Sequence, residues 1–180
     1  YRRAVIAEGA DASIRERLAV ALFRIERFDE ALSQLNRLDH EALLAGRADL
    51  QTMRADCLTA AGRLSEARSL YEQAARTDPT YGPAFRGLAR AALTEGDRRR
   101  AGVAVAKAMA LNPQDPQTVI LAGCIELAEG RSERARIAFE RAHALDPQNA
   151  LAVTLLGLLR EREGDTAGAA DAYSKALRLE

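Results

Sequence analysis

Residues able to do chemistry are few in this 180-residue chain, and they are widely separated. The two histidines, His40 and His143, lie more than 100 positions apart, and no carboxylate–histidine–nucleophile set converges on either. Cys57 and Cys124 have no CxxC or Cys/His spacing that would hold zinc, and the sequence has no glycine-rich phosphate loop. We therefore predict that the chain is not an enzyme and that it holds no metal and no cofactor.

The charges are balanced, with 26 Lys+Arg against 26 Asp+Glu. Nucleic-acid binding normally requires a basic excess, so we expect no nucleic-acid partner. The only basic run, Arg98 to Arg100, is interpreted as a solvated helix start rather than a phosphate contact. No apolar run reaches 18 residues, which predicts no direct membrane insertion. Apolar residues make up 48% of the chain and aromatics only 4%, and the many alanines favour helix over strand.

A period of 34 residues organises the chain, which predicts a repeat architecture. Glycines, alanines and prolines recur at this spacing. They are Gly62, Gly96, Gly130 and Gly164; Ala67, Ala101, Ala135 and Ala169; Ala74, Ala108, Ala142 and Ala176; and Pro79, Pro113 and Pro147.

Each period predicts two helices joined by a tight turn. Apolar spacing indicates a first helix over residues 117–127, and Gly130 then supplies the positive φ of a helix end. We expect Ser132 to cap a second helix that runs over residues 133–145. Pro147 closes the unit, because proline lacks the amide that would continue a helix.

This unit resembles the tetratricopeptide repeat (TPR) family. The family's pattern places a large residue, Leu-Gly, an aromatic, Gly, Ala, an aromatic, Ala and Pro at set offsets. The last unit carries Val153, Leu156, Gly157, Gly164, Ala169, Tyr173 and Ala176 at these offsets. The resemblance implies an all-α fold, a right-handed α-solenoid of stacked helix-turn-helix units without strands. It also implies that small residues such as Gly123 and Ala135 allow close helix approach, and that Tyr71 and Phe139 fill the gaps between units.

The resemblance covers the whole chain as a single array. We expect a partial repeat at residues 1–11 and full repeats at 12–47, 48–81, 82–115, 116–149 and 150–180. The expected helices are 1–8, 12–26, 28–43, 49–61, 64–77, 82–95, 98–111, 116–129, 132–145, 150–163 and 166–179. The repeat at 12–47 is the most divergent, because Glu26 stands where the turn glycine is expected and two extra residues lie within 39–47. The start within a repeat suggests a fragment of a larger protein.

In the family, an exposed stripe on each first helix lines a concave ligand groove. The resemblance therefore implies partner-binding residues at Glu16, Asp49, Thr52, Asp56, Arg86, Arg90, Leu93, Ile120, Cys124, Leu127, Thr154 and Leu158. These positions change from acidic through basic to apolar along the chain, which favours a partner segment with an acidic part followed by an apolar part. The anchors would be the pair Arg86 and Arg90 and the strip from Ile120 to Leu158. It stays open whether this gradient is incidental.

Some chaperone-binding members of the family hold a peptide carboxylate with Lys, Asn and Arg from successive first helices. This chain has Leu121 where that arrangement needs Asn, and Leu151 and Leu155 where it needs basic residues. The resemblance therefore does not extend to a carboxylate clamp.

Two classes of function remain. The first is a protein–protein interaction scaffold that binds a peptide or protein and helps to assemble a bacterial complex in secretion, pilus formation, polysaccharide export or the envelope. The alternative is a substrate-recruiting segment of a larger enzyme, such as a glycosyl- or sulfotransferase. Weak self-association through the terminal repeats is also expected, through Tyr173 and Leu177 at one end and Tyr1, Val5 and Ile6 at the other. Two cysteines that should stay reduced slightly favour the cytoplasm over the periplasm.

Overall fold

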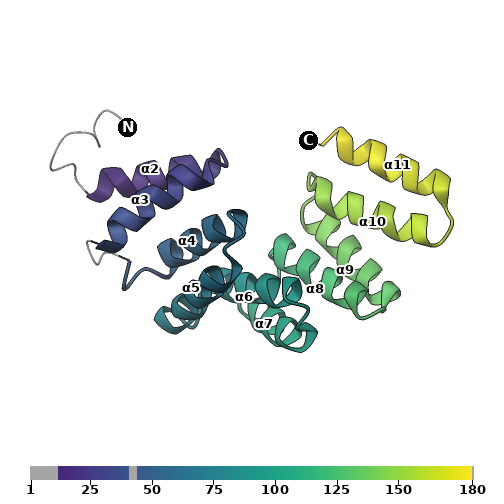
Figure 1. Cartoon of the computed structure of the whole chain (residues 1–180). Helices are drawn as coiled ribbons and strands as arrows, with labels where there is room; N and C mark the ends of the chain where they lie inside the picture. Colours follow the sequence, from purple (N-terminus) through teal and green to yellow (C-terminus); the bar gives the residue numbers. More distant parts are fainter. Residues whose placement is uncertain (1–11, 41–43, 180) are drawn as a thin grey trace. The chain divides into compact units, whose positions relative to one another are not determined.

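The computed structural model describes residues 12–40 and 44–179, and these residues form ten α-helices and no strand (Figure 1). In chain order the helices are α2 (Ala12–Arg24), α3 (Phe28–His40), α4 (Ala48–Ala60), α5 (Leu64–Thr77), α6 (Gly82–Thr94), α7 (Arg98–Leu111), α8 (Pro116–Ala128), α9 (Ser132–Leu145), α10 (Ala150–Arg162) and α11 (Thr166–Leu177). The ten helices predicted between residues 12 and 179 are confirmed, most ending one to three residues before the predicted position. The helix predicted for residues 1–8, with Tyr1, Val5 and Ile6, lies outside the described residues.

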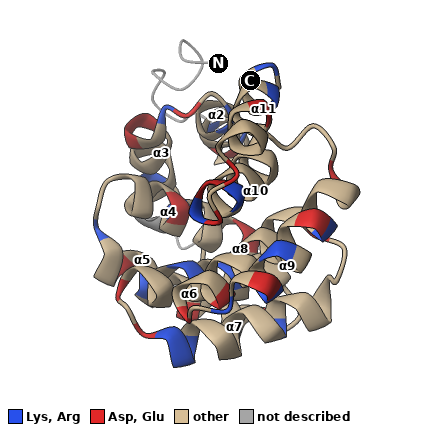
Figure 2. Cartoon of the chain, turned by 90° about the vertical axis from the view of Figure 1, so that its right-hand side faces the viewer, with Lys and Arg blue, Asp and Glu red and all other residues tan. Residues whose placement is uncertain are grey.

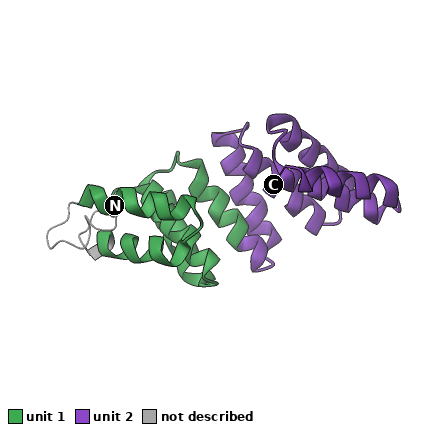
Figure 3. Cartoon of the chain, turned by 90° about the horizontal axis from the view of Figure 1, so that it is seen from above, with its two compact units in different colours: residues 1–91 green, residues 92–180 purple. Residues whose placement is uncertain are grey.

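The chain divides into two compact units, residues 1–91 and residues 92–180, coloured separately in Figure 3. The division falls within α6. In the first unit (unit 1), α2 packs on α3, α3 on α4, and α4 on α5. In the second unit (unit 2), α7 packs on α8, α8 on α9, α9 on α10, and α10 on α11. Each helix therefore packs mainly against its neighbours in the chain, as expected of stacked repeats.

The turn within each helix pair repeats one backbone geometry. Gly130 has φ +78°, and the Arg131 amide donates to the Glu126 carbonyl at 2.9 Å, which caps the end of α8. The positive φ predicted for this glycine is confirmed. Glu26 occupies the same place between α2 and α3 with φ +58°, and the Arg27 amide donates to the Leu22 carbonyl in the same way. The divergent repeat thus keeps the turn although it lacks the glycine.

The helix starts differ from one repeat to the next. Asp97, Asp115 and Asp165 each accept a hydrogen bond from a backbone amide of the first turn that follows. The prediction that Ser132 caps α9 is wrong. Ser132 is the first residue of that helix, and the capping position belongs to Arg131, whose side chain makes no cap hydrogen bond.

The core of each unit combines an aromatic ring with a glycine on a neighbouring helix. In unit 1 the Tyr71 ring is fully buried, and a methyl group at Gly87 would overlap it. In unit 2 the Phe139 ring is fully buried, and a methyl group at Gly123 would overlap that ring. The expected close helix approach at Gly123 is confirmed, and the reason is that the ring lies directly over the backbone.

Candidate functional site

His143 and the two cysteines do not form a reactive centre. Within the described residues, no group of three His, Cys, Asp or Glu side chains is placed to hold a metal ion. Both cysteines are free thiols. Burial is the main cause that raises the pKa of Cys57 to about 12, and burial also raises the pKa of Cys124. Both thiols therefore stay protonated at neutral pH, which removes their nucleophilic form.

The acidic end of the predicted groove carries its own counter-ion. The Arg47 guanidinium, just before α4, donates from Nη2 to Glu16 Oε1 at 2.8 Å and to Asp49 Oδ2 at 2.9 Å. The hydrogen bond from Arg47 is the main cause that lowers the pKa of Asp49 below its ordinary value of 3.8. Two predicted groove carboxylates are thus paired with an arginine that the sequence pattern did not single out.

The middle of unit 1 holds a second polar network across α4, α5 and α6. The Tyr71 hydroxyl donates to Asp56 Oδ1 at 2.6 Å, and Arg90 Nη2 donates to the Tyr71 hydroxyl oxygen at 2.8 Å while it also ion-pairs with Asp56. Thr59 Oγ1 lies 3.2 Å from the same hydroxyl oxygen. Burial, followed by the neighbouring Asp56 charge, raises the pKa of Tyr71 to about 12, so the phenol remains neutral. Predicted groove residues Asp56 and Arg90 therefore bind each other.

The other predicted positions of unit 1 are less accessible. Thr52 is 5% exposed, and none of the described residues forms a hydrogen bond with its hydroxyl. Arg86 is half-buried. The charges that look separate along the sequence, and that Figure 2 marks in blue and red, are largely matched inside this unit.

Unit 2 presents a different surface on its first helices. Ile120 is 5% exposed and belongs to the core, whereas Cys124 and Leu127 are half-exposed on the same helix. On α10, Leu158 is half-exposed and Leu151 is 56% exposed. We call Cys124, Leu127, Leu151 and Leu158 the apolar stripe.

Two other predicted positions of unit 2 add little to that surface. The Thr154 hydroxyl donates to the Ala150 carbonyl at 2.9 Å and is thereby satisfied within its helix. Leu93, at the end of α6, is half-buried.

One internal correspondence explains why the two units differ. The aromatic residue of the second helix lies 12 positions after a first-helix residue that matches its polarity. Tyr71 stands with Thr59 and Tyr173 donates to Glu161 at 2.7 Å, whereas Phe139 corresponds to Leu127. This matching, visible in the sequence at a fixed offset, is the signal that would have found the Tyr71 network.

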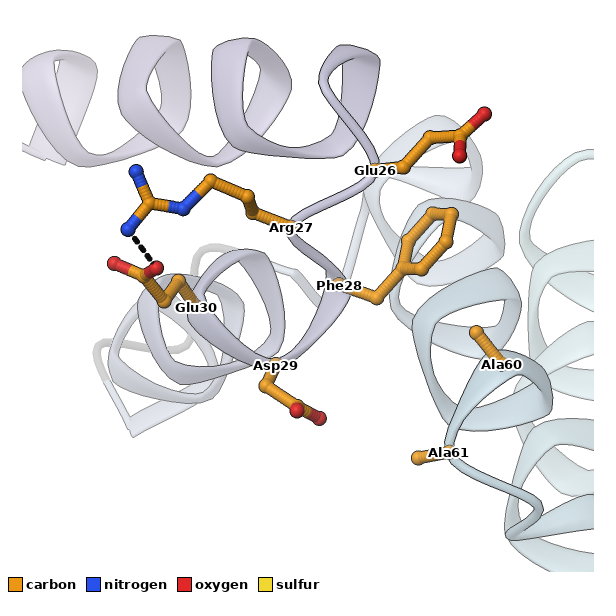
Figure 4. A pocket seen from close by; sticks show the side chains of 7 residues that line it. All are labelled: Glu26, Arg27, Phe28, Asp29, Glu30, Ala60 and Ala61. Atoms are coloured by element: carbon orange, nitrogen blue, oxygen red, sulfur yellow. Dashed lines mark hydrogen bonds and ion pairs between the residues drawn. The ribbon is translucent and has the colours of Figure 1, made fainter.

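Two cavities lie beside the predicted groove positions rather than at them. The larger, about 300 Å³ in unit 1, lies between the turn after α2 and the end of α4, where Phe28, Ala60 and Ala61 meet the charged residues Glu26 and Asp29 (Figure 4). A smaller cavity of about 170 Å³ in unit 2 lies beside His143, whose Nε2 is 3.1 Å from Lys175 Nζ. Neither cavity brings a nucleophile and a base together.

Paired helices, left-handed turns at a 34-residue spacing and aromatic–glycine packing define the class: the chain is a TPR protein of the all-α solenoid type. Residues 52–180, more than half of the chain, match the family described as the Cilia and flagella-associated protein 70 middle TPR-like domain. The chain therefore belongs to this family. No curated protein matches the sequence.

Solved TPR structures have the same fold. TTC0263, a thermophilic TPR protein from Thermus thermophilus, superimposes with a TM-score of 0.84 at 20% identity, over 94% of this chain and 91% of that one. MamA from Desulfovibrio magneticus RS-1 gives 0.68 at 21% identity, over 96% and 97% of the two chains. YrrB, whose structure is described as that of a TPR protein with an unusual peptide-binding site, gives 0.60 at 20% identity, over 94% and 87%.

None of the described helices is long and apolar enough to cross a membrane.

Proposed function

We propose that this chain is a protein-interaction scaffold that binds an apolar peptide or protein segment along the apolar stripe of unit 2. The observation that carries the proposal is the exposure of Leu151, at 56%, on the same helix face as half-exposed Leu158. Fully burying a leucine contributes about 1.5–3 kcal/mol, so a partner gains most where the side chain is still in water. The peptide-binding description of YrrB supports the same use of the fold.

The stripe is also held in a rigid setting. Cys124 and Leu127 of α8, and Leu155 of α10, pack at the edge of one core cluster that contains Phe139 and Leu159. Their inner surfaces are therefore fixed by the core, and only their outer surfaces remain to be covered. A preformed apolar surface costs little conformational entropy on binding.

The predicted anchors change with the structure. We leave Thr52 and Ile120 out of the binding surface because both are buried. Reversing the charge of Arg90 would place a carboxylate against Asp56 and disturb α4–α6 packing, so it does not test partner binding by itself. Arg86 and the remaining polar positions of unit 1 stay predictions.

The narrower assignments also stay predictions. These are assembly of a bacterial complex in secretion, pilus formation, polysaccharide export or the envelope, the alternative role as a recruiting segment of a larger enzyme, and self-association through the last repeat. For the last of these, Leu177 is 73% exposed on α11, whereas Tyr173 is half-buried.

The test selects peptides from a displayed library on the immobilised chain and measures their affinity for variants. Leu151→Asp should weaken the selected peptides by about tenfold or more, because a charge replaces an apolar contact. Leu177→Asp is the matched control, since it changes an exposed leucine of unit 2 outside the stripe. Equal affinity of the peptides for Leu151→Asp and for the unchanged chain would refute the proposal.

A further inference from the structure

Two aliphatic side chains on the second helices of unit 2 lie in water. Val103 of α7 is 69% exposed and Ile137 of α9 is 58% exposed. They are 34 residues apart and therefore occupy the same position in successive repeats. The second helices bury Ala101 and Val105 of α7, and Ala135 and Phe139 of α9, so the exposed pair plays no part in that packing.

Each exposed aliphatic residue lies between two exposed cations at helical spacing. Arg100 and Lys107 stand three positions before and four positions after Val103. Arg134 and Arg141 stand at the same offsets from Ile137. Residues at i, i+3 and i+7 share one helix face, so each helix presents an aliphatic side chain between two positive charges.

The two faces belong to neighbouring parts of unit 2. Both α7 and α9 pack on α8. The Arg141 guanidinium also donates to the Pro113 carbonyl, in the turn that follows α7. We call Arg100, Val103, Lys107, Arg134, Ile137 and Arg141 the outer basic–apolar face.

The other second helices do not repeat this combination. At the equivalent positions α3 has Glu30, Ser33 and Arg37, α5 has Glu66, Ser69 and Gln73, and α11 has Gly168, Asp171 and Lys175. All of these helices adopt the same fold, so the repeat architecture does not require the combination found on α7 and α9. A pattern that the fold does not need, and that leaves two branched aliphatic side chains in water, indicates a surface used for contact.

We propose that the outer basic–apolar face binds an acidic segment of a partner protein, whose apolar side chains cover Val103 and Ile137 while its carboxylates lie against the flanking cations. Charge complementarity selects this occupant, because four cations frame the two aliphatic side chains. A protein segment fits better than a lipid surface because α9 also exposes Glu133 and Glu140, which anionic headgroups would repel, and neither helix has an exposed aromatic residue. The face is on the second helices, so it is independent of the proposed stripe on the first helices.

The test uses three synthetic peptides that form an amphipathic helix: one with leucines flanked by glutamates, one with the glutamates replaced by lysines, and one with the leucines replaced by serines. Binding is measured by fluorescence anisotropy at low and high salt, and by methyl NMR of the chain labelled at Val and Ile. The Glu/Leu peptide should bind, shift the Val103 and Ile137 methyl signals, and weaken with salt. The lysine and serine peptides should bind about tenfold more weakly or worse.

The diagnostic variant is Val103→Ser/Ile137→Ser, which installs the residue found at the equivalent positions of α3 and α5. It should weaken the Glu/Leu peptide by about tenfold, since both apolar contacts are lost. Its matched control is Ile25→Ser/Arg37→Glu, which removes a 62% exposed aliphatic side chain and a cation from unit 1 and should leave affinity unchanged.

Three outcomes would overturn the proposal. The first is equal binding of the Glu/Leu and Lys/Leu peptides. The second is methyl shifts confined to first-helix residues such as Ile120 and Ile125. The third is binding to vesicles of anionic phospholipid without binding to the Glu/Leu peptide, which would assign the face to a membrane surface.

Discussion

The two units have the same backbone plan but differ in what their first helices present. In unit 1 the first-helix charges are cross-linked, with Arg47 bridging two carboxylates and Arg90 bound to Asp56 and Tyr71. In unit 2 the corresponding stripe is apolar and partly exposed. The repeat pattern of small and aromatic residues therefore fixes the fold, while the residues between those positions decide whether a surface is closed internally or left for a partner.

The outer faces differ in the same direction. Val103 and Ile137 are exposed in unit 2, where the second helices of unit 1 have serines. Unit 2 thus presents apolar side chains on both its first and its second helices. This difference makes unit 2 the part of the chain where we expect partners.

The largest effect is expected in the core of unit 2. Phe139→Ala should lower the free energy of unfolding by about 3–5 kcal/mol, because a fully buried ring leaves a cavity over Gly123. Ile137→Ala, two residues away and exposed, should change it by about 0.5 kcal/mol or less. Denaturant unfolding of both variants measures the difference, and comparable losses would show that the two helix faces are assigned the wrong way round.

Overpacking the same helix pair should cost less. Ala135 is fully buried, and Ala135→Leu should destabilise the chain by roughly 1–3 kcal/mol, because the added atoms have no space between α8 and α9. Ala144→Leu adds the same atoms at an exposed position of α9 and serves as the control. If thermal unfolding ranks Ala135→Leu as harmless, the packing register of α9 is wrong.

Exchanging the aromatic residues tests the contrast between the units directly. Tyr71→Phe should cost about 1–2 kcal/mol, because Asp56 and Arg90 lose the hydroxyl between them. Phe139→Tyr should also destabilise, by about 1–3 kcal/mol, because it places a hydroxyl near the apolar Leu127 position. The pair Phe139→Tyr/Leu127→Thr copies the unit 1 combination and should recover part of that loss. No recovery in the double variant would break the correspondence.

The turns offer a smaller effect of opposite sign in the two units. Glu26→Gly should stabilise the chain by about 0.5–1 kcal/mol, because it relieves a side chain held at φ +58°. Gly130→Ala should destabilise it by about 1 kcal/mol, because it introduces a side chain at φ +78°. Melting temperatures that move in the same direction for both would contradict this explanation.

The smallest effect concerns acid pH and unit 1. The Arg47 hydrogen bond holds the pKa of Asp49 below 3.8 in the folded chain, so the stability it provides is present above about pH 4 and is lost as pH falls through the lowered pKa. Because the Asp49 side chain is 48% exposed, solvent screening limits this contribution to roughly a few tenths of a kcal/mol. Arg47→Met should remove that pH dependence, whereas Arg37→Met, an exposed arginine elsewhere in unit 1, should keep it. Unfolding free energies measured from pH 6 downward compare the two.

The sequence by itself determined the helices and turns of this protein. The 34-residue spacing of glycine, alanine and proline predicted ten helices and the positive φ of Gly130, because helix ends and tight turns depend on residues next to one another in the chain. The half-exposed Cys124, Leu127 and Leu158 were also predicted from helical periodicity.

Only the tertiary structure decided how side chains distant in sequence meet. Arg47 reaches Glu16 over 31 positions, and Arg90 reaches Asp56 over 34. Periodicity gives the face on which a side chain lies, but not its rotamer or the depth to which a neighbouring helix covers it, so the burial of Thr52 and Ile120 did not follow from spacing. The charges of unit 1 are paired, and the leucines of unit 2 are exposed, because of how each helix packs against the next.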